Sequence, residues 1–236
     1  MGFSKISAVS LTDLCIQQIE NMILSGELSI GEKLPTERDL SAKMGVSRPV
    51  IASCLVELEK LGFVDVVPRQ GVYVCDYRRK GSIETLEAIM RYNNGAMRQG
   101  EVKSLLEIRD ACEALCLKLV LGSNSSEEIE KVLSPILDSL GSTDDCDVAS
   151  EAVFRFYHEL AVMSGNAILP LLYYSFREQG KYLWFIYCKR NGIRKMYDLK
   201  LELFQALVNG DLDSCLEQTH TILQAAIKEL SFYVAN

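Results

Sequence analysis

Histidine, tryptophan and proline are scarce in this chain of 236 residues, which holds two histidines, one tryptophan and five prolines. The sequence also lacks a nucleophile elbow, a P-loop, a dinucleotide fingerprint and the HExxH zinc motif. With so few histidines and none of these motifs, the sequence predicts that the chain is not an enzyme.

Long apolar runs are missing as well. Stretches such as Tyr182 to Cys188 are far shorter than the roughly 20 residues that a membrane-spanning helix needs. The first 15 residues show no basic segment followed by an apolar core and a cleavage site, so we expect no export signal and a cytoplasmic protein. At about 150 residues per domain, the length predicts one or two domains.

The eight cysteines form no CxxC pair and no zinc-finger spacing. In a reducing compartment they are expected to be small buried hydrophobic residues. Cys112 and Cys116 lie one helical turn apart and leave open a shared metal or redox role, although a place in the core is the favoured interpretation.

Charge is distributed unevenly along the chain, whose formal net charge is -7. Residues 1–80 carry ten basic and ten acidic residues, whereas the remainder carries 15 basic and 22 acidic residues. A neutral first module joined to an acidic second one suggests two separate tasks.

Three helices are predicted in the first module. Ile16, Ile19 and Ile23 form the apolar stripe of a helix from Thr12 to Leu24, and Gly26 follows it. Thr36 is expected to cap a second helix from about Glu37 to Met44. Ser47 is expected to cap a third, whose apolar face carries five residues, Ile51, Cys54, Leu55, Leu58 and Leu61.

After Gly62 the apolar period changes from helical to alternating. FVDVV, a turn at residues 68–71 and VYVC predict a two-stranded hairpin. Three helices and a hairpin make a winged helix-turn-helix, expected over residues 1–76. The short corner at Gly45 and Val46 would let the N-terminus of the third helix enter a major groove.

The run GELSIGEKLPTERDLSAKMGVSRPVI, followed by LEKLGFV and RQGVYV, resembles the DNA-binding domain of the GntR family of bacterial transcription regulators. The resemblance implies DNA contacts by Arg38, Arg48 and Gly71. A guanidinium can bond two acceptors on a guanine edge, and a glycine lets the wing backbone approach the minor groove. The predicted DNA-contacting residues are Arg38, Lys43, Ser47, Arg48, Pro49, Arg69, Gln70 and Gly71.

One position departs from the family pattern. A further arginine usually follows one turn into the recognition helix, where this chain has Ala52. We therefore expect a different or less guanine-rich half-site. Arg69 on its own could equally be a solvated surface charge.

The second half is predicted to be an antiparallel bundle of helices over 82–236, joined to the first module by a basic linker at 77–81 that either lies near DNA or is a solvated hinge. Helical patterns run over 82–93, 100–121, 125–140, 146–164, 166–190, 193–209 and 211–233, with no convincing strand. The fold class is mainly α.

LLEIRDACEAL, FYHELAVMSGN and LFQALVNGD resemble the effector-binding FCD domain of the FadR subgroup of that family. The resemblance implies a dimerising bundle that holds a small molecule, commonly a carboxylic acid, and in many members a metal on one Asp and three His. The corresponding positions here are Val153, Tyr157, Lys200 and Ile222, so no metal is expected. His158 and His220 are displaced around their helices by about 100° and 200° from the ligand positions.

Without a metal, an anionic effector needs other partners. Arg109, Tyr157 and Lys200 are the predicted effector-binding residues, acting as two cations and a hydroxyl donor. The alternative for Arg109 is an i, i+4 salt bridge to Glu113. An acyl-CoA is a second candidate effector, since the aromatic residues of YYSFREQGKYLWFIYC could line a tunnel, although such a stripe is more often core or interface.

The sequence therefore predicts a homodimeric transcription regulator that binds an inverted-repeat operator and senses a small anionic metabolite, with no cofactor and no membrane partner. A constitutive DNA-binding protein with a purely structural dimerisation domain is the alternative.

Overall fold

The computed structural model describes residues 10–91 and 99–230 of the chain. Its contacts divide into two compact units, residues 1–94 and 95–236, which are considered separately below. The ends of two predicted helices, at 92–93 and 231–233, lie outside the described residues.

Three helices begin the N-terminal unit: α1 (Leu11–Ser25), α2 (Glu37–Met44) and α3 (Arg48–Lys60). They match the predicted helices. The Thr36 hydroxyl oxygen accepts a hydrogen bond from the Asp39 backbone N–H, which is the expected cap of α2. Ser47 occupies the cap position of α3, but its side chain makes no capping hydrogen bond, so that detail of the prediction was wrong.

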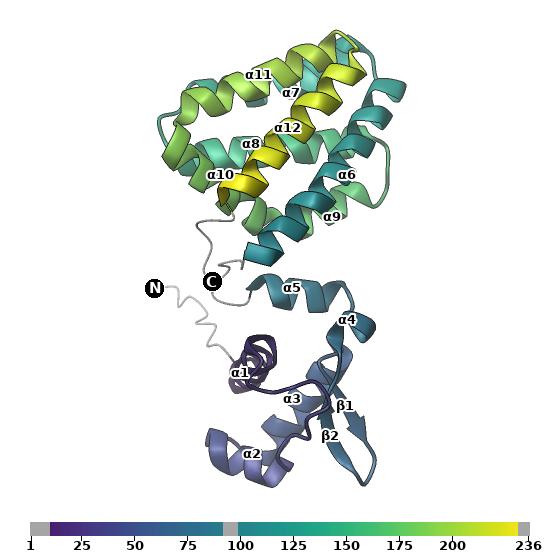
Figure 1. The fold of residues 1–236 in the computed structure, drawn as a ribbon, viewed down its shortest axis with the longest axis vertical. Coiled ribbons are helices and arrows are strands. Elements are labelled where there is room, and N and C mark those ends of the chain that lie inside the picture. The colour runs from purple at the N-terminus through teal and green to yellow at the C-terminus, as the bar shows by residue number, and fades with distance from the viewer. Residues whose placement is uncertain (1–9, 92–98, 231–236) are drawn as a thin grey trace, which may run out of the picture. The chain divides into compact units, whose positions relative to one another are not determined.

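The predicted wing is an antiparallel hairpin of β1 (Val64–Val67) and β2 (Gly71–Val74), with Val64 opposite Val74 (Figure 1). The connector before α2 adds to it, because Lys33 forms a bridge with Tyr73 and the Leu34 N–H donates to the Val72 carbonyl. The wing is therefore attached to the body along its second strand.

The expected linker at 77–81 is instead part of the N-terminal unit. Residues Tyr77–Lys80 form the short helix α4, and α5 (Ile83–Arg91) follows. Tyr77, Ala88 and Ile89 pack on the same apolar core as α1 and α3. The amphipathic helix α5 buries its apolar face on the winged module. The structure thus moves the domain boundary from 77–81 to between residues 94 and 95.

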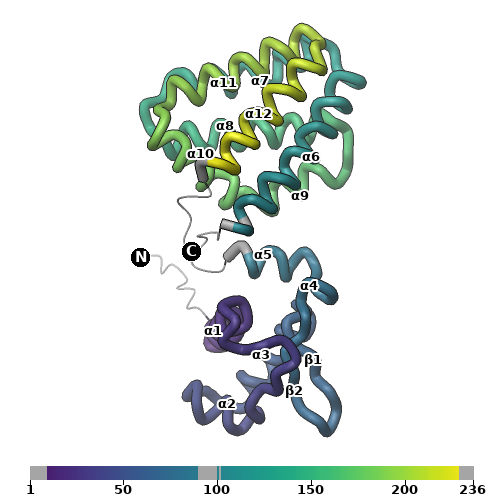
Figure 2. Tube along the Cα trace, in the orientation of Figure 1, coloured from purple at the N-terminus to yellow at the C-terminus, as the bar shows by residue number. Residues whose placement is uncertain are grey.

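The second unit is all-helical in the residues described, as predicted. Its helices are α6 (Gln99–Ser123), α7 (Ser126–Gly141), α8 (Cys146–Met163), α9 (Leu169–Ser175), α10 (Arg177–Asn191), α11 (Ile193–Val208) and α12 (Leu212–Leu230). Figures 1 and 2 show α12 beside α6 and α11 beside α7, and these pairs are in contact. Across the described part of both units, no helix is long and apolar enough to span a bilayer.

The segment 166–190 was predicted as one helix, and this was wrong. The backbone breaks at Phe176, whose φ of -101° and ψ of 17° are not helical, and α9 ends there. The break turns Phe176 toward a cavity that α9 and α10 both line. The local sequence has no glycine or proline at this point, so its pattern predicts a continuous helix. Tertiary packing of the Phe176 side chain overrides that prediction.

Two of the cysteines do not fit the prediction of free buried thiols. Cys146, the first residue of α8, and Cys188, near the end of α10, form a disulfide with their Cα atoms 5.8 Å apart. The other six are free, and among them Cys112 and Cys116 share no bond. Sequence spacing did not reveal the pair because α8 and α10 meet only in the folded bundle.

Candidate functional site

The corner between α2 and α3 holds the N-terminus of α3 in a fixed position. Gly45 has a φ of +67°, which a glycine adopts at little cost. The Ser41 hydroxyl donates to the Val46 carbonyl at 2.6 Å, and the Val46 N–H donates back to the Ser41 carbonyl. These bonds lock the helix-turn-helix that presents Arg48, the first residue of α3.

Most of the predicted DNA-contacting side chains are exposed. The Arg38 side chain is 75% exposed and lies 3.6 Å from Asp39. Arg48 is exposed in the first turn of α3. The same holds for Lys43, Ser47, Pro49, Arg69 and Gln70. The winged unit therefore presents these groups to solvent, where a duplex can reach them.

The wing tip is a tight turn with an unusual backbone. The Gln70 N–H donates to the Val67 carbonyl at 3.0 Å, with Pro68 between them and Arg69 at a φ of +63°. Pro at the second position and positive φ at the third are typical of a type II turn, where glycine is normally preferred at the third. Arg69 therefore holds a backbone conformation that glycine adopts more easily.

Gly71 and Lys33 meet beside that turn. Gly71 has a φ of +120°, and a Cβ there would lie 2.7 Å from the Lys33 Cε. Lys33 is exposed, and its ammonium lies 5.8 Å from the centre of the Tyr73 ring. The sequence analysis did not single out Lys33, which lies in the segment before α2 that pairs with the second strand of the wing.

The basic residues of the predicted linker at 77–81 form ion pairs with nearby carboxylates. Arg78 and Arg79 pair with Asp76, and Lys80 pairs with Asp65 at 2.6 Å. Their charge is thus largely balanced within the N-terminal unit, unlike that of Arg48.

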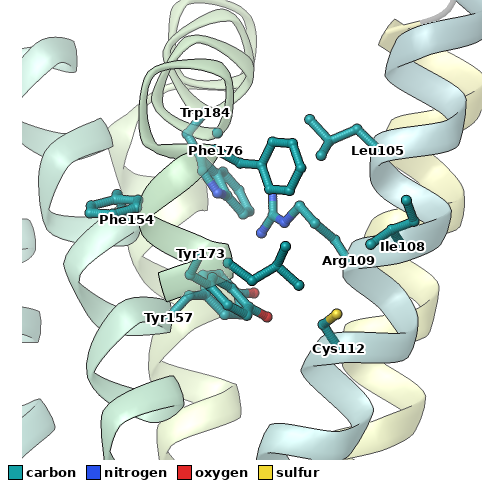
Figure 3. Close-up of a pocket in the computed structure, with 11 residues that line it drawn as sticks. Leu105, Ile108, Arg109, Cys112, Phe154, Tyr157, Tyr173, Phe176 and Trp184 are labelled. Carbon is teal, nitrogen blue, oxygen red and sulfur yellow. The ribbon is translucent and has the colours of Figure 1, made fainter. Parts of the chain in front are cut away.

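Side chains of α6, α8, α9 and α10 line a small cavity in the helical unit (Figure 3). Its volume is about 30 Å³, enough for one or two water molecules. It is lined mostly by apolar and aromatic side chains: Leu105, Ile108, Arg109, Cys112, Phe154, Tyr157, Leu172, Tyr173, Phe176, Gly180 and Trp184.

Arg109 brings a charge to this cavity from α6. Its side chain is 12% exposed and donates through Nε at 3.0 Å and Nη2 at 2.6 Å to the Glu113 Oε1. The salt bridge expected as the alternative for Arg109 therefore exists, but the guanidinium also reaches into the cavity toward Trp184 (Figure 3). Burial raises the pKa of the Glu113 carboxyl, although Arg109 and Lys200 oppose the shift.

Lys200 lies behind the cavity wall rather than in it. It is fully buried on α11, and its ammonium donates to the Tyr157 hydroxyl. The ammonium also lies 4.4 Å from the centre of the Tyr157 ring and 4.6 Å from that of Trp184. Burial lowers the pKa of Lys200 to about 7. The structure thus brings Tyr157 to the cavity with Arg109 and places Lys200 one layer further in.

Tyr173 is a cavity residue that the sequence did not single out. It is nine-tenths buried, and no nitrogen or oxygen atom of the described residues forms a hydrogen bond with its hydroxyl. The hydroxyl does interact with the weakly polar Cys116 thiol, whose pKa burial raises to about 12. A buried hydroxyl without a strong partner is costly, so this group favours a ligand or water in the cavity.

The family's metal positions do not fit a metal here. Val153 and Ile222 offer no ligand atoms, and Tyr157 is bonded to the Lys200 ammonium, a cation that repels another cation. In the two described ranges, no group of three or more His, Cys, Asp or Glu side chains could hold a metal ion.

Each of the two histidines contacts another side chain. His158 stacks on Phe154, with ring centres 5.6 Å apart. His220 is exposed and bonds Asp110 through Nδ1 at 2.6 Å.

A helix-turn-helix with a wing, followed by an all-helical unit, defines a class of DNA-binding protein. Sequence profiles agree: "Bacterial regulatory proteins, gntR family" matches residues 12–74, and "FCD domain" matches residues 104–225. The chain belongs to the gntR family of bacterial transcription regulators and carries an FCD domain.

Named relatives are regulators as well. The HTH-type transcriptional regulator Mce2R of Mycobacterium tuberculosis is 28% identical over 75% of this chain and 73% of its own length. LutR of Bacillus subtilis is 26% identical over 80% of this chain and 87% of its own. The fatty acid metabolism regulator protein of Proteus mirabilis is 25% identical over 71% and 68%. The chain is a transcription regulator and not an enzyme.

Solved structures support the fold. A Listeria monocytogenes protein, Lar, described as controlling the agr system, has a TM-score of 0.63 at 14% identity and covers 98% of this chain and all of its own. A GntR family member from Pseudomonas syringae has a TM-score of 0.51 at 17% identity, over 95% and 87%.

Proposed function

We propose that this regulator is a homodimer whose two winged modules bind the halves of an inverted-repeat operator, and whose helical units change that binding when a small organic anion enters the cavity beside Arg109. No metal takes part in holding the anion. The protein acts where it meets chromosomal DNA, in the cytoplasm.

The exposed cations of the winged unit support the DNA half of the proposal. Arg38 and Arg48 can each bond a guanine edge through two N–H groups, which gives sequence selectivity. Lys43, Ser47, Arg69 and Lys33 can contact phosphates, which give affinity and register but no sequence selectivity. Gly71 lets the wing backbone approach closely, and Pro49 and Gln70 complete the surface.

Exposed apolar side chains on the helical unit support the dimer. Ile108 is 49% exposed and Leu115 is 43% exposed, and both lie on one side of α6 two turns apart. A second copy of this unit would remove such groups from water, and a two-fold dimer matches a two-fold operator.

One observation carries the effector half. Arg109 and Lys200 are both buried, and each interacts with the same carboxylate, that of Glu113. When Lys200 is protonated, this core holds two cations and one anion. A bound anion beside Arg109 and Tyr157 would supply the missing negative charge, with Lys200 acting from behind Tyr157.

The test begins with selection of DNA by the full chain from a random duplex library. We expect an inverted repeat, a symmetric footprint and, by light scattering, twice the mass of the chain. Fluorescence anisotropy on the selected duplex is then repeated with a panel of organic anions and acyl-CoAs. A change in affinity that is lost in Arg109→Gln supports the proposal, whereas affinity unchanged by every compound favours a constitutive regulator.

A further inference from the structure

Two cavities of the helical unit share a wall. The small cavity of about 30 Å³ has a neighbour of about 210 Å³ between α6, α10, α11 and α12. Arg109 and Trp184 line both of them. A shift of either side chain would therefore join the two spaces into one.

Hydrogen-bond donors gather on the small cavity. The Arg109 guanidinium uses Nε and Nη2 on Glu113, which leaves Nη1 for a ligand. The Tyr157 hydroxyl accepts from Lys200, so its own proton is available to an acceptor. The Tyr173 hydroxyl is the third donor, and in Figure 3 both hydroxyls point toward α6. All three side chains line the small cavity, and a carboxylate can accept hydrogen bonds from a guanidinium and from hydroxyls.

The large cavity has the opposite character. Its inner wall is apolar, made by Leu106, Leu183, Trp184, Leu199, Ile222, Leu223 and Ala226. The polar residues Lys195 and Thr221 that also border it are exposed, which places them at its rim. Such a wall accepts methylene or aryl groups and penalises buried hydroxyls.

Volume limits the size of the ligand. The small cavity has room for a group the size of a carboxylate or a water molecule, and the large one is below the roughly 300–1,000 Å³ of sites for drug-sized ligands. A long acyl chain or a coenzyme A group would have to extend beyond these two cavities.

We propose that the double cavity binds a compact apolar monocarboxylate, a short alkyl or aryl acid, with its carboxylate at Arg109, Tyr157 and Tyr173 and its apolar body beyond Trp184. This inference rests on the proposed function and narrows it from any organic anion to one class.

A six-carbon series tests the class by calorimetry on the full chain. Hexanoate is the probe, hexanamide removes its charge, adipate adds a second carboxylate, and gluconate keeps one carboxylate but adds hydroxyls. We expect hexanamide to bind about 10–100-fold more weakly, because it loses charge-assisted hydrogen bonds. Adipate and gluconate are expected to bind about 100-fold more weakly, because they bury unpaired polar groups.

Two substitutions test the location. Tyr173→Phe removes only a hydroxyl and should weaken hexanoate about 5–10-fold without loss of thermal stability. Tyr182→Phe, at an exposed tyrosine of α10 that lines neither cavity, is the matched control and should change nothing. Ala226→Phe fills the large cavity and should weaken hexanoate while leaving acetate, which needs only the small cavity, unchanged.

The outcomes separate this inference from the proposed function. Tighter binding of gluconate, adipate or octanoyl-CoA than of hexanoate, lost in Arg109→Gln, would overturn the ligand class and leave an anion-sensing regulator standing. Hexanoate affinity unchanged by Tyr173→Phe and Ala226→Phe would overturn the location. If no organic anion binds the chain, both the inference and the effector half of the proposed function are wrong.

Discussion

Arg38 and Arg48 of the winged unit lie in solvent, whereas Arg109 and Lys200 of the helical unit lie almost wholly inside it. The exposed fraction of the side chain is 75% for Arg38 and 12% for Arg109, and Lys200 is fully buried. A duplex approaches from outside, so its partners stay hydrated until it binds. The proposed anion would meet cations that are already desolvated, and burying those cations costs stability unless other groups compensate.

The largest expected effect comes from removing the two exposed arginines, Arg38 and Arg48. Arg38→Ala with Arg48→Ala would delete the two proposed base contacts in each half-site, at about 1–3 kcal/mol per contact, so operator affinity should fall about 1,000-fold or more. A gel shift with the selected duplex measures it. The melting temperature should stay nearly unchanged because both side chains are exposed.

Lys60→Ala is the control for that experiment, since it removes an exposed cation from the opposite end of the same helix α3. It should retain operator binding. Full binding by the double variant would refute the assignment of the recognition surface.

The disulfide sharpens the contrast between the units, because the cysteines of the winged unit, Cys15, Cys54 and Cys75, are all free. The bridge from Cys146 to Cys188 spans 42 positions, and its loss should destabilise the helical unit by about 4 kcal/mol through the entropy of the unfolded chain. Urea unfolding with and without dithiothreitol measures this. Cys146→Ser should abolish the effect of the reductant.

A count of thiols in the denatured, unreduced protein provides a separate check. Six free thiols agree with the structure, and eight would contradict it.

A smaller expected effect is the free-energy cost of burying the Lys200 ammonium. The pKa of Lys200 is about 7 in the folded protein and near 10.5 when unfolded, so between pH 7.5 and 9.5 the unfolded chain binds a proton that the folded chain lacks. Stability should therefore rise with pH by about 1.4 kcal/mol per unit over this window. Lys200→Met should lack this contribution, so urea unfolding of both proteins at several pH values measures it. Identical slopes would show that burial does not depress this pKa.

The smallest effect lies at the wing tip. Arg69→Gly should stabilise the N-terminal unit by about 0.5–1 kcal/mol relative to Arg69→Ala, because glycine adopts a φ of +63° without strain. Thermal unfolding measures the difference. Both variants should weaken operator binding alike and reduce its salt dependence by about one phosphate contact per wing; an unchanged salt slope would mean that Arg69 is only a solvated charge.

The sequence was most informative for the winged unit because its signals are local. Thr36 and Gly45 mark the ends of α2, and alternation defines the hairpin. The sequence did not predict that α5 packs on the winged unit, because α5 contacts α1 and α3 through residues that are distant in the sequence.

The helical unit was predictable in outline only. Its apolar periodicity gave most of the helices, but the break at Phe176 has no turn residue to announce it. The place of Lys200 behind Tyr157, and the contact of the Tyr173 hydroxyl with Cys116, depend on how α6, α8, α9 and α11 pack. Such buried arrangements are properties of tertiary contacts, which a single sequence does not display.

The most direct test is calorimetric titration of hexanoate into the full chain, alone and saturated with its selected operator duplex. It shows whether the site at the buried cations and the site at the exposed cations are coupled. The account predicts that the duplex changes hexanoate affinity by the same factor by which hexanoate changes operator affinity, because coupling between two sites is reciprocal. Hexanoate that binds with equal affinity to the free and the DNA-bound protein would contradict it.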